Sequence, residues 1–123
     1  MLNLKSIMVG SREPKALAEF YAKVFGKPAD MAEEESKWWG WMAGNTFLGI
    51  GLHSEVAGRA QEPARIILNM ETTEVAEEFE RIKALGATVI KEPYTMEGMA
   101  EFWIATFADS DGNYFQLMSP WKA

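Results

Sequence analysis

Near the end of the chain a polar turn leads into an alternating strand, Asp109-Ser110-Asp111-Gly112-Asn113-Tyr114-Phe115-Gln116-Leu117. Its Gly-Asn pair is a common signal for a hairpin turn. The same pair opens a predicted strand earlier in the chain, in Gly44-Asn45-Thr46-Phe47. The later turn also resembles half of a calcium loop, but the glutamate that completes such a loop does not follow, which favours a hairpin. The two matching turns indicate an internal repeat.

A helix is predicted before each of these turns. The first begins near Pro14, which suits a first helical turn, and ends at Gly26, where a left-handed cap is wanted. Its apolar stripe has helical spacing and consists of Leu17, Phe20, Tyr21, Val24 and Phe25. The second helix has Thr72 or Thr73 as its cap and ends at Gly86. Its stripe consists of Val75, Phe79, Ile82 and Leu85.

Short strands fill the rest of the repeat. The first half is predicted to have a strand at Leu2–Val9 and three more between residues 29 and 53. After a polar linker at Ser54–Pro63, the second half has strands at Arg65–Met70, Thr88–Lys91, Glu101–Phe107 and Tyr114–Met118. Residues 91–100 are predicted as a mobile loop whose methionines could cover an apolar ligand. The pattern predicts an α+β fold, one domain of residues 1–123 with two tandem βαβββ modules at about 1–53 and 64–123.

The composition narrows the function classes. The chain has 123 residues, a net charge of -6 and no cysteine. Nucleic-acid binding needs clustered Lys and Arg, and an acidic chain does not suit an anionic membrane surface, so neither partner is expected. The absence of cysteine excludes disulfides, thiolate nucleophiles and cysteine-based zinc sites. Without a signal peptide or a membrane-spanning apolar run, we expect a cytoplasmic protein.

Two segments resemble the vicinal oxygen chelate superfamily, which includes glyoxalases, extradiol dioxygenases and bleomycin-resistance proteins. One is the helix end Phe20–Gly26, and the other is the hairpin Asp109–Leu117. With the repeat, the resemblance covers almost the whole chain. It implies two βαβββ modules whose strands form a curved mixed sheet around a cavity, completed by a homodimer.

The resemblance also implies where metal-dependent relatives hold a divalent ion, on four inward-facing strand positions. By spacing these fall on Ser6, on Leu48 or Ile50, on Ile67 with Arg65 as the same-face alternative, and on Gln116. These side chains supply no carboxylate and no imidazole, so they would not replace the hydration of the cation. We therefore expect neither a metal nor another cofactor.

Tryptophans are the most unusual feature of the sequence. Trp39 and Trp41 alternate on one predicted strand and so share a face, whereas Trp38 points away. Trp103 lies on the matching strand of the second half. Packing in the core or in a dimer competes evenly with stacking on an aromatic ligand. The predicted ligand-binding residues are Trp39, Trp41, Trp103, Arg65, Asn69, Gln116, Ser6, Leu48, Ile50, Ile67, Tyr114 and Met118.

His53 is the only histidine, and the favoured interpretation is a partly exposed residue at a strand end, because no nucleophile or carboxylate is placed beside it. The leading hypothesis is a metal-free, dimeric protein that sequesters a hydrophobic or aromatic compound, as antibiotic-resistance relatives do. The rival hypothesis is a lyase or isomerase similar to the glyoxalases. A third possibility is a module whose tryptophans bind a protein partner.

Overall fold

The computed structural model describes residues 1–120 and divides into two compact units, Met1–Gly58 and Arg59–Ala123. The boundary falls within the segment predicted as a linker. Each unit contains one helix and one four-stranded mixed sheet in the order βαβββ. The predicted α+β fold of two repeated modules is therefore confirmed.

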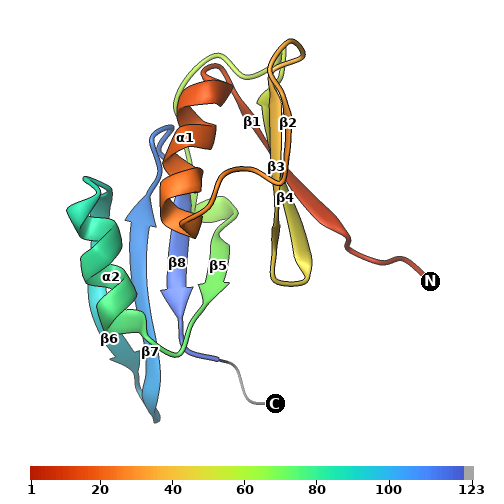
Figure 1. The fold of residues 1–123 in the computed structure, drawn as a ribbon. Helices are drawn as coiled ribbons and strands as arrows, with labels where there is room; N and C mark the ends of the chain where they lie inside the picture. Colours follow the sequence, from red (N-terminus) through yellow and green to blue (C-terminus); the bar gives the residue numbers. More distant parts are fainter. Residues whose placement is uncertain (121–123) are drawn as a thin grey trace. The chain divides into compact units, whose positions relative to one another are not determined.

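Unit 1 contains β1 (Ser6–Ser11), α1 (Pro14–Phe25), β2 (Met31–Glu33), β3 (Trp38–Ala43) and β4 (Thr46–Leu52) (Figure 1). Its strand order is β1-β4-β3-β2. The first strand runs parallel to β4, and the other neighbours are antiparallel. Gly26 ends α1 with a φ of 72°, the left-handed conformation predicted for it.

Unit 2 repeats this order with β5 (Leu68–Glu71), α2 (Val75–Ala84), β6 (Thr88–Met96), β7 (Met99–Ala108) and β8 (Tyr114–Met118). The short helix η1 (Pro63–Arg65) precedes β5. The strand order is β5-β8-β7-β6, with β5 parallel to β8. Figure 1 shows α2 lying along β6 and β7, which it contacts.

Each helix packs on one face of its own sheet. In unit 1 the Phe25 ring lies 5.7 Å from the Trp41 ring, between their centroids, so Trp41 belongs to the face that α1 covers. In unit 2 Phe79 of α2 stacks on Phe107 at 5.1 Å, and Phe107 stacks on Phe115 at 5.4 Å. Burying these rings drives each helix onto its sheet.

Three sequence predictions about elements are corrected. The first strand begins at Ser6 rather than at residue 2, and Met1 to Lys5 are exposed. Arg65 lies in η1, because Pro63 starts a helical turn there. Residues 91–100 are not a loop, since β6 and β7 run through them and leave only residues 97 and 98 between the strands.

The cap of the second helix also differs in detail from the prediction. Glu74 occupies the cap position without a side-chain hydrogen bond, while its backbone N–H donates to the Thr72 hydroxyl at 3.0 Å.

Within residues 1–120, no helix combines the length and apolar character that crossing a bilayer requires.

Candidate functional site

The face of unit 1 that α1 covers holds two of the predicted ligand-binding tryptophans. Trp41 is 1 % exposed, and its indole N–H donates to the Lys27 carbonyl at 3.1 Å. Trp39 is 9 % exposed and shares this face. Two rings so deeply buried in the core have little surface left for a ligand, so the geometry assigns them to packing.

Leu48 and Ile50 lie on the same covered face, because they pair with Trp41 and Trp39 across β3 and β4. Both are buried, at 4 % and 0 % exposed. The sequence analysis placed all four residues on the cavity face. That placement is corrected because α1 needs large apolar partners, and in β4 the large residues alternate with Gly49 and Gly51.

The opposite face of this sheet, here called the helix-free face of unit 1, carries a different set of side chains. Strand pairing places on it Ser6 and Met8 of β1, Trp38 and Met42 of β3, Phe47 of β4, and Met31 of β2. The three methionines are 54 %, 44 % and 53 % exposed in the order Met8, Met42, Met31. Of these residues, only Ser6 was predicted as part of the site.

Two aromatic rings lie over glycines on this face. Trp38 and Phe47 stack with centroids 5.9 Å apart and planes inclined by 23°. A Cβ added to Gly40 would collide with the Phe47 ring, and one added to Gly51 would lie 3.1 Å from Cδ1 of Trp38. The glycines therefore create the space in which the two rings lie flat. Sequence reasoning missed this pair, although the spacing Gly49, Gly51 in β4 was a signal for it.

The helix-free face of unit 2 brings together four predicted residues. Asn69 of β5 pairs with Gln116 of β8, which pairs with Thr106 of β7. Gln116 donates from Nε2 to the Thr106 hydroxyl at 3.0 Å. Tyr114 and Met118 flank Gln116 on the same strand face. The result is a polar row across the sheet with apolar neighbours, and Thr106 is the member that the sequence did not indicate.

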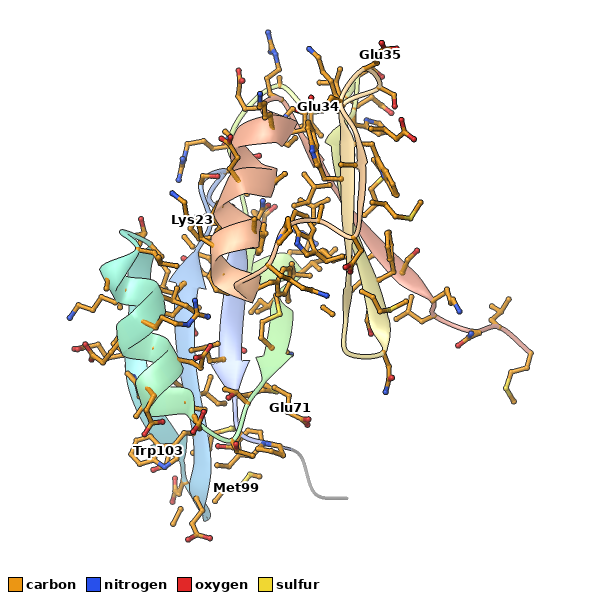
Figure 2. The ribbon with its side chains drawn as sticks, viewed as in Figure 1. Lys23, Glu34, Glu35, Glu71, Met99 and Trp103 are labelled. Carbon is orange, nitrogen blue, oxygen red and sulfur yellow. The ribbon has the colours of Figure 1, made fainter. Side chains whose placement is uncertain are left out.

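The other predicted residues of unit 2 lie outside this row, although Arg65 lines a pocket of about 340 Å³ together with Tyr114. Arg65 is exposed in η1 and forms an ion pair with Glu62 at 3.0 Å, and Ile67 precedes β5. The expected alternation through these residues fails because the strand begins only at Leu68. Trp103 is 45 % exposed and alternates with Ile104, which shares the face of Met118, so Trp103 points to the other face. Figure 2 shows Trp103 and Met99 toward the end of the β6–β7 hairpin.

Two further features of unit 1 are polar. His53 follows β4, and its Nδ1 accepts a hydrogen bond from the Glu55 backbone at 3.1 Å, which uses one ring nitrogen structurally. A pocket of about 320 Å³ lies at the start of α1 and is reached by the edge of Trp39. Its polar lining combines three cations with two carboxylates, namely Arg12, Lys15, Lys37, Glu13 and Glu34. Such a mixed lining does not match a hydrophobic ligand.

The donor set does not fit a divalent cation. On the helix-free faces, the positions nearest to those implied by the family are Ser6, Asn69 and Gln116, which offer only neutral oxygens. Across residues 1–120, no group of three or more His, Cys, Asp or Glu is arranged to hold a metal. In the same range, every buried side-chain nitrogen and oxygen has a hydrogen-bond partner. Hard cations prefer several anionic oxygens, which these positions lack.

Comparison with known proteins identifies the fold family. A family model described as a glyoxalase-like domain matches residues 6–118. None of the curated proteins compared with the chain matches it. The match runs from the first strand to the last, so it includes both units.

Several solved structures share this fold. A glyoxalase/bleomycin resistance protein/dioxygenase family enzyme from Burkholderia phytofirmans PsJN is 25 % identical, with 96 % of this chain and 98 % of that chain covered and a TM-score of 0.73. Lactoylglutathione lyase from Agrobacterium tumefaciens is 16 % identical, with coverages of 95 % and 92 % and a TM-score of 0.73. The fosfomycin resistance protein FosX from Listeria monocytogenes is 22 % identical, with coverages of 98 % and 93 % and a TM-score of 0.65. The latter two likenesses show the fold alone.

Proposed function

The chain belongs to the glyoxalase-like domain family of the vicinal oxygen chelate superfamily, and from this premise we propose that it binds a small hydrophobic or aromatic molecule without a metal. The observation that carries the proposal is the stacked pair Trp38 and Phe47 on the helix-free face of unit 1. Large aromatic surfaces outside a core commonly serve recognition, because each ring offers much contact area with little conformational freedom to lose.

The surroundings of these rings support a planar apolar ligand. Gly40, Gly49 and Gly51 give the two rings room to lie against the backbone, and both half-buried rings keep part of their surface for a flat molecule. Met8, Met31 and Met42 border the rings with flexible, polarizable side chains that adapt to different shapes. Apart from this ring pair, the helix-free face of unit 2 carries the amides of Asn69 and Gln116, which can hydrogen-bond a polar group.

Sequestration of a toxic compound in the cytoplasm is the form of binding that we propose. The fold is shared with a protein named for fosfomycin resistance, and the donor set on the helix-free faces does not fit a catalytic metal. A lyase or isomerase activity is the second candidate. It is favoured by the description of the Burkholderia protein as an enzyme, at 25 % identity over nearly the whole chain.

The test compares two tryptophan variants with the uncharged fluorescent probe phenylnaphthylamine. Trp38→Ala should weaken probe binding about thirtyfold, as expected for an aromatic anchor worth about 2 kcal/mol. Trp103→Ala is the matched control, because this exposed ring lies on the other face of its sheet. The control should keep the affinity of the unchanged protein, and EDTA should leave every titration unaltered.

Three results would argue against the proposal. An affinity of Trp38→Ala within a factor of two of the unchanged protein would remove its main support. Loss of probe binding in Trp103→Ala alone would show that Trp103, and not Trp38, is the ligand-binding tryptophan. A requirement for metal would favour the enzyme. Melting temperatures of both variants, measured by circular dichroism, separate lost affinity from lost folding.

A further inference from the structure

The sixth strand departs from regular pairing at three places, and the last of them lies between Thr95 and Met96. The register between β6 and β7 shifts between Val89 and Lys91 and again between Lys91 and Tyr94. Across these shifts Lys91 pairs with Thr106, and Tyr94 pairs with Ile104. Register shifts of this kind are β-bulges, which redirect side chains and are common beside functional sites. Pro93 lies within the second shift, where a strand tolerates proline.

The shifts change the charge of the helix-free face of unit 2. Thr88 pairs with Ala108 on this face, so unbroken alternation would next bring Ile90 and Glu92 there. The bulges instead place Lys91 on it, in line with Thr106. Regular pairing would have placed the apolar Ile90 and the acidic Glu92 on this face, whereas the bulged strand places the cationic Lys91 there.

Lys91 completes the polar row, which now crosses all four strands as Asn69, Gln116, Thr106 and Lys91. Its Nζ lies 5.5 Å from the centroid of the Tyr94 ring, which restrains the ammonium over the face. Among the described residues, no carboxylate forms an ion pair with Lys91.

Strand pairing places one acidic side chain on this face, Glu71 at the end of β5 (Figure 2). It lies on the opposite edge strand, three strand spacings or about 14 Å from Lys91. That separation exceeds the screening length in physiological salt, about 8 Å. Glu71 therefore does not neutralise the Lys91 ammonium.

We propose that Lys91 makes the helix-free face of unit 2 select ligands that carry an oxyanion, so that a molecule bound there is an apolar or aromatic acid rather than a neutral compound. The ammonium binds the oxyanion, and the Gln116 and Asn69 amides farther along the row can hydrogen-bond other polar groups of the ligand. The inference rests on the proposed binding function and names its ligand class. The net charge of -6 means that the chain as a whole repels anions. A preference for an anionic ligand would therefore have to come from a local cation such as Lys91.

The test uses two fluorescent probes that share one ring system, anilinonaphthalene sulfonate and the uncharged phenylnaphthylamine. The unchanged protein should bind the sulfonate more tightly. Lys91→Gln should weaken sulfonate binding about fivefold and leave the uncharged probe unaffected, whereas Lys91→Arg should keep the preference. Lys83→Gln is the matched control, because Lys83 also lies over an aromatic ring, Phe79, but on α2.

The outcomes separate the inference from the function on which it rests. If both probes bind and Lys91→Gln changes neither affinity, the inference is overturned while ligand binding stands. If Lys83→Gln weakens the sulfonate as much as Lys91→Gln does, the effect is one of net charge, and the assignment to Lys91 fails. If neither probe binds the unchanged protein at millimolar concentration, the proposed function fails first. Melting temperatures verify that each variant is folded.

Discussion

At the scale of single residues, Gly40 determines how the Phe47 ring lies. A side chain at this position would enter the space of the ring, so Gly40→Ala should force Phe47 off its place. Overpacking of this kind costs about 1–3 kcal/mol in the free energy of unfolding, which urea titration measures. Gly58→Ala is the control, because a Cβ there meets nothing within 4 Å. Equal stability of the two variants would contradict the described position of Phe47.

The tryptophans show how far a sequence specifies individual side chains. Alternation correctly separates Trp38 from Trp39 and Trp41, but it does not say which face the helix covers. The covered face was identifiable from β4, where Leu48 and Ile50 alternate with glycines. Only cross-strand register, which depends on the whole sheet, connects those residues to Trp41 and Trp39.

At the scale of elements, Asp30 connects the residue before β2 to the end of β3 and so stabilises the β2–β3 hairpin. Its carboxylate accepts a hydrogen bond from the Met42 backbone at 2.7 Å and contacts the Lys27 ammonium at 3.2 Å. These two interactions, the backbone one first, hold the pKa of Asp30 below its ordinary value of 3.8. A lowered pKa means that the carboxylate stabilises the fold above pH 3.8 and loses this effect as the pH falls through the lowered pKa.

Asp30→Asn should therefore lower the melting temperature by a few degrees near neutral pH, since the pair is exposed, and the difference should shrink as the pH falls below 3.8 and through the lowered pKa. Glu35→Gln is the control, because Glu35 lies in the turn between β2 and β3 (Figure 2) and forms no ion pair among residues 1–120. Melting curves across this pH range measure both variants. A deficit of Asp30→Asn that persists undiminished in acid would show that the carboxylate charge is not its cause.

Both helices and most strands were predictable because their signals are local. Apolar spacing and the terminal glycines place the ends of α1 and α2 within a few residues. The sixth strand was not predictable, because Pro93, Gly98 and two methionines suggest a loop. The strand stays paired with β7 because register shifts accommodate its irregular residues, and no local sequence pattern indicates these shifts. Because of the same shifts, alternation along the strand predicts the wrong face for Lys91.

At the scale of the whole chain, the repeat predicted the fold, whereas the site depends on tertiary features. Two weak turn matches and two helix ends in one order were enough to indicate tandem βαβββ units. Asn69, Tyr114, Gln116 and Met118 share one face because β8 is regular, and their binding of a ligand stays a prediction. A shared fold hosts many chemistries, so the family restricts the function without choosing it.

The last prediction is that the protein forms a homodimer in solution. The described structure leaves apolar side chains uncovered: Leu2 is 98 % exposed, Leu4 is 84 % exposed, and the adjoining strand β1 pairs only with β4. An unpaired strand edge beside apolar side chains is a surface that a second chain can cover, with burial of both. Light scattering at micromolar concentration should then give twice the mass of one chain. Replacing Leu2 and Leu4 together by Asp should shift the mass toward one chain, whereas a folded monomer at tens of micromolar would contradict the prediction.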